Sequence, residues 1–189
     1  MKRSLIAAAV AVACICTAST ASAQSVSPIR FGVAGGLSIP QGDDADFIGT
    51  GYNITGVLGF QAPMVPVGLR FDLGYNGFGE KDDSGVKLNV LSGTVNGIFN
   101  MGMAPMVSPY LIGGVGFYRA KADFDGVDGE DEPDATTDLG LNGGIGVRFG
   151  LSGFSTFAEA RYHYVFSKDE DIEGDENSSF IPITFGIMF

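Results

Sequence analysis

The sequence has few of the residues that build metal centres, disulfides and nucleic-acid surfaces. It contains one His, two Cys and no Trp. Both cysteines, Cys14 and Cys16, lie in an N-terminal segment that we expect to be removed, so the remaining chain has no thiol for a disulfide. Lys and Arg total 11 against 22 Asp and Glu, and the formal net charge of −11 leaves no basic patch for nucleic acid.

Long apolar runs and helical periodicity are also scarce. Beyond residue 23, no apolar run reaches the roughly 18 residues of a transmembrane helix. Apolar residues at helical spacing are hard to find anywhere in the chain. Glycine is frequent, with 29 residues. This composition predicts an all-β chain.

The first 23 residues have the pattern of a secretory signal peptide. A Lys-Arg pair precedes an apolar run from residue 5 to about residue 15, and small residues lead to a cleavage site after Ala23. We therefore expect an exported domain at 24–189. The alternatives are an N-terminal membrane anchor, for which the run is short, and a lipoprotein attached through Cys14, whose preceding residues match a lipobox poorly.

The rest of the chain alternates between apolar and polar residues in eight segments. This period of two predicts β-strands. In one segment Leu69 and Phe71 lie opposite Arg70 and Asp72. The segments are 29–39, 51–61, 67–77, roughly 87–99, 109–119, 139–149, 154–164 and 179–189. The alternation in segment 87–99 is less clean, and segment 109–119 is apolar on both faces, so the registers of both segments stay open.

The connections between the predicted strands alternate in length and charge. The short, nearly uncharged ones are 62–66, 100–108 and 150–153. The long, acidic ones are 40–50, 78–86, 120–138 and 167–179. Every acidic residue except Asp72 and Glu159 lies in the four long connections. One end of the structure is therefore expected to be strongly negative.

The polar face of the strands does not suit a soluble protein. It consists of Gly, Ser, Thr and Asn with a few charges, whereas a sheet face in water normally carries many charged residues. A soluble sandwich or lipocalin-like barrel is thus disfavoured. The pattern predicts an eight-stranded antiparallel transmembrane β-barrel of up-and-down topology, with lipid outside and a polar interior. Closure pairs the last strand with the first and leaves no exposed edge.

Four charged residues on the polar face are predicted to form an ion network inside the barrel. An Arg facing lipid at the bilayer centre costs roughly 2–4 kcal/mol, so strand charges belong inside. The third and seventh strands of such a barrel lie on opposite walls, which brings Arg70 and Asp72 towards Glu159 and Arg161. We interpret this network as a packing core. A transport or catalytic role is the alternative.

With these features, the sequence resembles the small outer-membrane β-barrel proteins of Gram-negative bacteria, of the OmpX and OmpA-barrel type. The stretches that carry the resemblance are PYLIGGVGFY (109–118), LGLNGGIGVRFG (139–150), AEARYHYVF (158–166) and ITFGIMF (183–189). The resemblance implies an outer-membrane location and a monomer with both termini in the periplasm. The terminal pattern looks like the signal that the outer-membrane assembly machinery recognises, carried here by Ile183, Phe185, Ile187 and Phe189.

The family covers structural, adhesive and porin-like members, so the resemblance leaves the activity open. We expect a structural or surface-interaction role, with lipid, lipopolysaccharide and an extracellular ligand of the loops as partners. A narrow porin-like channel for ions or small solutes is the alternative. Lipid A deacylases resemble this architecture and carry a His-x-Ser pair, but here Val165 follows His163 at that spacing. We therefore expect no enzyme activity and no cofactor.

The acidic connections also raise the question of calcium. Segment 169–180 starts like a calcium-binding loop, with acidic residues at its first, third and fifth positions. Its twelfth position is Phe180, where a bidentate Glu is needed. Segment 123–134 departs further from the pattern. We expect no specific metal site.

Overall fold

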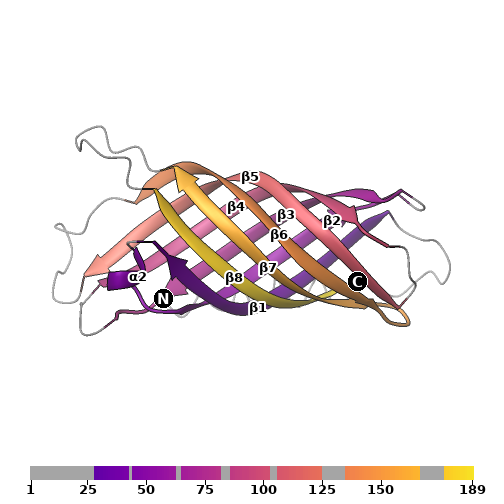
Figure 1. Cartoon of the computed structure of the whole chain (residues 1–189), viewed down its shortest axis with the longest axis horizontal. Coiled ribbons are helices and arrows are strands. Elements are labelled where there is room, and N and C mark those ends of the chain that lie inside the picture. The colour runs from indigo at the N-terminus through magenta and orange to yellow at the C-terminus, as the bar shows by residue number, and fades with distance from the viewer. Residues whose placement is uncertain are drawn as a thin grey trace, which may run out of the picture.

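The eight strands form a closed barrel in which all neighbouring strands are antiparallel (Figure 1). The computed structural model describes residues 28–42, 44–62, 65–81, 86–102, 106–124, 135–166 and 177–189. The strands are β1 (Ile29–Gln41), β2 (Gly51–Phe60), β3 (Val67–Phe78), β4 (Val86–Asn100), β5 (Val107–Phe124), β6 (Thr136–Gly150), β7 (Ser155–Phe166) and β8 (Ser178–Met188). The predicted fold class is therefore confirmed. No helix among these residues is long and apolar enough to cross a membrane.

The seam between β1 and β8 closes the barrel. Their register runs from Gly32 opposite Met188 to Gln41 opposite Ser179. Beyond it, Phe31 and Phe189 exchange two backbone hydrogen bonds, of 3.2 and 2.8 Å. The apolar last strand thus has a partner along its whole length, and no edge is left for aggregation.

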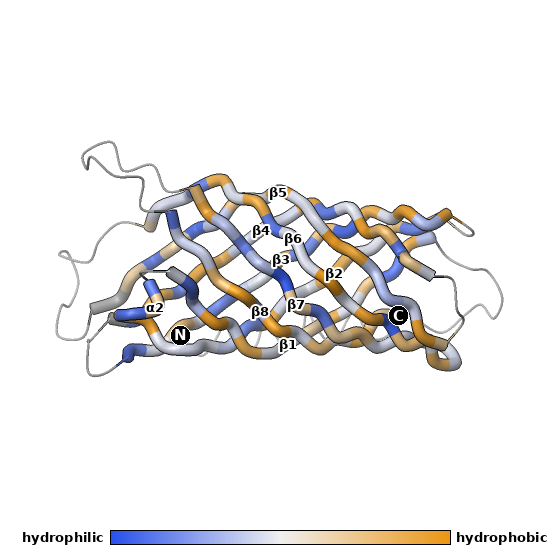
Figure 2. Tube along the Cα trace, in the orientation of Figure 1, coloured by the Kyte–Doolittle hydropathy of each residue, from blue (hydrophilic) through white to orange (hydrophobic). Residues whose placement is uncertain are grey.

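Successive side chains point alternately into and out of the barrel, and Figure 2 shows the matching change of hydropathy along the strands. On β3, the outward Leu73 is 64% exposed in the isolated chain, whereas the inward Arg70 is 1% exposed. On β5, whose register the sequence left open, Tyr110 and Tyr118 point inward and are each 1% exposed. The apolar exterior and polar interior are those of a barrel surrounded by lipid.

The two ends of the barrel differ as the sequence predicts. Strands β1, β3, β5 and β7 finish at one end, on the left in Figure 1, which we call the acidic-loop end. Strands β2, β4, β6 and β8 finish at the other, the turn end. The acidic connections leave from the acidic-loop end, and Ile29 and Phe189 lie at the turn end.

Two predictions about the acidic-loop end were wrong in detail. Strand pairing continues into the predicted loop 120–138, since β5 reaches Phe124 and β6 begins at Thr136. A helical turn, α2 (Asp44–Phe47), follows β1 and was not predicted. Beyond the hydrocarbon layer a strand no longer needs an apolar outer face, so the alternation that marks the strands fades before the pairing does.

Several predicted segments lie outside the described residues. They are the signal peptide, 1–23, and most of the two acidic segments weighed as calcium loops, 123–134 and 169–180. The expected cleavage after Ala23 and the expected lack of a specific calcium site stay predictions.

Candidate functional site

The most concentrated chemistry of the described residues lies in the middle of the lumen. Arg70 on β3 and Glu159 on β7 meet there, with Arg70 Nη1 2.9 Å from Glu159 Oε2 and Arg70 Nη2 2.7 Å from Oε1. Asp72 lies 2.9 Å from Arg70 Nε. Arg161 completes the set, with Nη1 3.0 Å from Asp72 and Nε 2.7 Å from Glu159. The structure thus brings together the four residues that we predicted, in a cycle that we call the luminal network.

The luminal network is deeply buried and electrically balanced. Its members are between 1% and 6% exposed. Two guanidinium groups face two carboxylates, so the network adds no net charge to the interior. Taking ions out of water is costly, and close pairing in low dielectric offsets that cost only while every partner is present. The arrangement therefore favours a fixed packing core over a mobile relay.

Neutral side chains from three further strands extend the luminal network. Tyr110 on β5 donates a 2.7 Å hydrogen bond to Glu159. Asn96 on β4 donates to Asp72 at 2.9 Å, and Asn142 on β6 donates to Asn96 at 2.9 Å. Hydrogen bonds and ion pairs thus connect β3 through β7 across the lumen. The inward position of Tyr110 could not be predicted from the sequence, because its strand is apolar on both faces. Asn96 and Asn142 belong to the Gly, Ser, Thr and Asn side chains of the polar strand face, and nothing in the sequence linked them to the charges.

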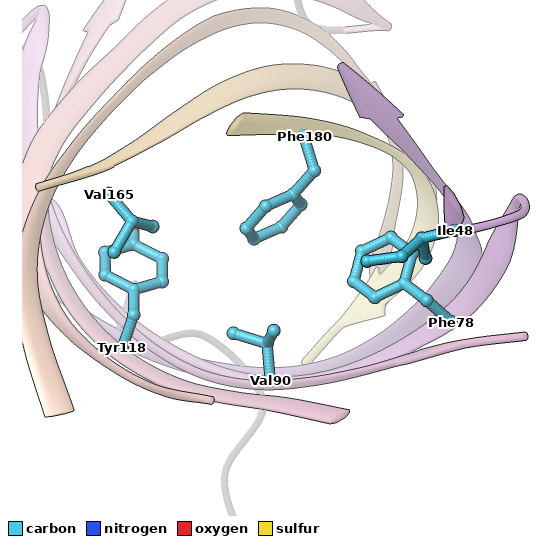
Figure 3. Close-up of a cluster of buried hydrophobic side chains, with 6 residues drawn as sticks. All are labelled: Ile48, Phe78, Val90, Tyr118, Val165 and Phe180. Carbon is cyan, nitrogen blue, oxygen red and sulfur yellow. The ribbon is translucent and has the colours of Figure 1, made fainter. Parts of the chain in front are cut away.

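Towards the acidic-loop end, apolar side chains take over. Figure 3 shows them projecting into the lumen from several strands. The aromatic cluster, as we call it, consists of Ile48, Phe78, Val90, Tyr118, Val165 and Phe180. The rings of Phe78 and Phe180 meet edge to face, with centroids 5.6 Å apart. Such T-shaped contacts are a favoured aromatic geometry, and they narrow the lumen at this end.

His163 lies between the luminal network and the aromatic cluster. Its Nδ1 is 2.8 Å from the Tyr118 hydroxyl, and its ring stacks on Phe180 with centroids 4.9 Å apart. It is 5% exposed, and its Nε2 has no hydrogen-bond partner among the described residues. These contacts are those of a packed core histidine.

The turn end of the lumen is filled in a different way. Phe157 and Met188 pack with Ala34 and Val57 in a small apolar cluster. Nearer the mouth, the Arg148 guanidinium lies over the Tyr110 ring, 5.4 Å from its centroid, a cation–π contact. A cavity of about 20 Å³ remains beside Arg30 and Arg148, enough for about one water. Arg30 lies on the inner side but is exposed at this rim.

Two inward glycines make room for the inward tyrosines. A Cβ on Gly146 would collide with the Tyr110 ring, and a Cβ on Gly140 would lie 2.7 Å from the Tyr118 ring. The glycines therefore accommodate close packing of aromatic side chains, rather than leaving open space along the lumen.

The other predicted site residues lie on the outer surface. Ile183, Phe185 and Ile187 share the outward face of β8, and Phe189 follows on the same side. They are 40%, 65%, 39% and 55% exposed in this order. This places them against lipid, and their role as an assembly signal stays a prediction.

No group of His, Cys, Asp and Glu suited to a metal ion occurs among the described residues. The luminal carboxylates already face guanidinium groups at 2.7 to 3.0 Å. Glu159 and Asp72 thus act as partners of the luminal arginines.

Comparison with protein families identifies this architecture. Residues 7–189 match the model of the outer membrane protein beta-barrel domain. The chain belongs to this family. Its place is therefore the outer membrane, with the apolar outer face of the barrel against lipid.

Solved structures support the fold. Neisserial surface protein A has 18% identity and a TM-score of 0.64, with 87% of this chain and 98% of that chain covered. The outer membrane protein OprG from Pseudomonas aeruginosa has 13% identity and a TM-score of 0.52, covering 89% and 99%. A major outer membrane protein from Thermus thermophilus has 14% identity and a TM-score of 0.50, covering 85% and 98%. The comparison with curated proteins gives no match.

Proposed function

We propose that this protein is a monomeric, closed outer-membrane barrel with a structural or surface-interaction role. One observation carries the proposal: Arg70 reaches from β3 to Glu159 on the opposite wall and is 1% exposed. An eight-stranded barrel has an interior that side chains can just fill. Here the luminal network, the aromatic cluster and the turn-end packing fill it in successive layers.

Conductance in planar bilayers tests the closed lumen. The purified barrel is expected to give no stable open state. The double variant Arg70→Ala/Glu159→Ala, which removes the two side chains that meet across the middle of the lumen, is expected to conduct in brief openings. The control Leu69→Ala changes only the outer face and is expected to stay silent. A stable, ion-selective open state of the unaltered protein would establish the narrow channel instead.

The surface role is supported by the separation of charge at the acidic-loop end. The connections there carry the acidic residues, whereas Lys87, Arg119 and Lys121 lie exposed on the outer wall of β4 and β5. In the β4–β5 register, Asn89 pairs with Lys121 and Asp123 pairs with Lys87. Basic side chains at the height of lipid headgroups attract phosphate groups. This wall suits contact with lipopolysaccharide.

Binding of lipopolysaccharide micelles tests that contact. The triple variant Lys87→Gln/Arg119→Gln/Lys121→Gln is expected to bind more weakly at low salt, with the difference shrinking as salt screens the charges. Arg30→Gln, at the turn end, is the matched control and is expected to leave binding unchanged. Equal binding by the triple variant and the unaltered protein would remove this part of the proposal.

The assembly role proposed for β8 is separable from its part in closure. Phe185→Ala is expected to reduce the amount of protein in cellular outer membranes but to fold from urea into lipid vesicles without other proteins. Phe117→Ala, an equally outward Phe on β5, is the control. A loss of vesicle folding in Phe185→Ala would mean that the residue acts in the barrel itself.

The expectation that the chain is not an enzyme also stays a prediction. The contacts of His163 with Tyr118 and Phe180 support it, because they hold the imidazole inside the packed lumen. Mass spectra of lipid A from cells with and without the protein test it. Identical acylation and headgroups are expected.

A further inference from the structure

A cavity of about 120 Å³ lies at the acidic-loop end of the lumen, next to the aromatic cluster. The side chains of the cluster line it, and Figure 3 shows them with Phe78 and Ile48 on one side of the lumen and Tyr118 on the other. The luminal network, in the middle of the barrel, closes the lumen and shares no residue with the lining of this cavity. The cavity is therefore an addition to the closed lumen, at the mouth of a barrel, where ligands commonly bind.

The lining of this cavity has two chemical parts. Its walls are apolar, and three of the side chains in them are aromatic: Phe78, Tyr118 and Phe180. Its polar part consists of Asp44, Thr136, Asp138, Ser178 and Ser179. Both charged groups of the lining are carboxylates. Asp138 lies directly opposite Tyr118 in the β5–β6 ladder, so one carboxylate is next to an aromatic side chain of the lining.

The size of the cavity limits its occupant. An engineered apolar cavity of about 150 Å³ holds one benzene molecule, so about 120 Å³ admits one ring or a short aliphatic chain. Aromatic faces attract cations as well as apolar groups. An anionic occupant would face two carboxylates and the negative field of the acidic connections, whereas a cationic one would be concentrated there.

We propose that this cavity binds a small amine that carries one apolar ring. The ring packs among Phe78, Tyr118 and Phe180, and the ammonium group pairs with Asp138 and Asp44 at the polar side. The serine and threonine hydroxyls accept the remaining ammonium hydrogens. This site goes beyond the proposed function, because neither a structural or surface-interaction role nor the alternative of conduction requires a bound amine.

Calorimetry on the full barrel in lipid nanodiscs tests the site, with protein-free nanodiscs as the blank. Benzylamine is the probe, and toluene and benzoate are its neutral and anionic counterparts. For a ligand of this size we expect a dissociation constant on the order of 1 mM. Benzylamine is expected to bind saturably and more tightly than toluene, and benzoate is expected not to bind.

Two variants separate the parts of the site. Val90→Phe fills the cavity and is expected to abolish benzylamine binding, whereas Val115→Phe, the same change on the lipid face of β5, is expected to leave it intact. Asp44→Asn/Asp138→Asn is expected to lower the affinity for benzylamine to that for toluene. This second variant changes no buried apolar contact, so it decides the matter if Val90→Phe fails to fold.

Three results would overturn the proposal. They are the absence of saturable benzylamine binding, equal binding of benzoate, and an affinity for benzylamine that is unchanged in either cavity variant. None of these results bears on conductance, so the failure of this site would leave the closed-barrel proposal standing.

Discussion

Arg70 and Glu159 come from opposite walls of the barrel, and each depends on the other for its burial. Asp72 and Arg161 complete the balance at 2.9 to 3.0 Å. A buried pair adds little over apolar packing, but the loss of one member leaves an uncompensated charge in low dielectric. At the residue scale, the contribution of each member of the luminal network to stability therefore depends on the presence of the other members.

Glu159→Gln tests this dependence. It leaves two guanidinium groups with one carboxylate, and we expect it to lower the free energy of unfolding by about 3–5 kcal/mol, measured by urea titration in lipid vesicles. The neutral double variant Arg70→Gln/Glu159→Gln keeps Arg161 with Asp72 and is expected to cost less than the sum of its single changes. Strict additivity would contradict the account. Arg119→Gln, on the exposed wall, is expected to stay within about 0.5 kcal/mol.

Gly146→Ala tests the packing of Tyr110. The new Cβ would collide with a ring that Glu159 holds by a hydrogen bond, so the ring has little freedom to move aside. We expect a loss of about 1–3 kcal/mol in unfolding free energy. Gly93→Ala, with nothing within 4 Å of its Cβ, is the control and is expected to be neutral or stabilising. Equal effects of the two changes would show that strand propensity, rather than the ring, sets the cost.

At the scale of single elements, each strand separates lipid from lumen by its period of two. On β3 the exposed Leu69, Leu73 and Tyr75 alternate with the buried Arg70 and Asp72. At Pro182 on β8, the ladder with β7 lacks the pairs at residues 161 and 162, because proline has no N–H to donate. The alternation of side chains continues through this gap. Each strand thus preserves the alternating inward and outward orientation of its side chains, even where its ladder of backbone pairs is interrupted.

Leu73→Arg tests this orientation of the side chains towards lipid or lumen. Leu73 lies near the middle of β3 on the lipid side, and we expect the charge to cost about 2–4 kcal/mol of folding free energy in vesicles. Thr137→Arg, at the end of β6 beside Arg119, is expected to cost about 0–1 kcal/mol, because it lies near the interface. A similar small cost at both positions would mean that no hydrocarbon surrounds the middle of β3.

The orientation of side chains towards lipid or lumen also explains what the sequence could and could not predict. The rule that charges avoid lipid orients the four strands that carry charges on their polar faces, β1, β3, β6 and β7, and on that basis Arg70 and Glu159 are found facing each other. The rule fails on β5, where Tyr110 and Val115 are both apolar enough for either side. Applied to Arg119, it would even give the wrong register, because that residue lies outward beyond the apolar band. Contacts such as that of Tyr110 with Glu159 depend on this register.

At the scale of the whole molecule, the barrel has an outside that suits acyl chains and an inside that is filled in layers. Cavities of about 120 and 20 Å³ lie towards its two ends. The luminal network in the middle of the barrel lies between these cavities, and the aromatic cluster lines the larger one. This filling is the basis of the proposal that the lumen is closed and that the protein interacts with other molecules through its rims and outer wall.

The most direct test of this account is the solvent of the outer face. Because the chain has no Trp, a single Trp introduced by Ile54→Trp or Leu58→Trp on β2 reports its surroundings alone. In vesicles of brominated phospholipid, the account predicts strong quenching at both positions, little quenching by aqueous iodide, and the reverse for Thr50→Trp at the acidic-loop end. Iodide quenching at positions 54 and 58 without quenching by brominated lipid would contradict it.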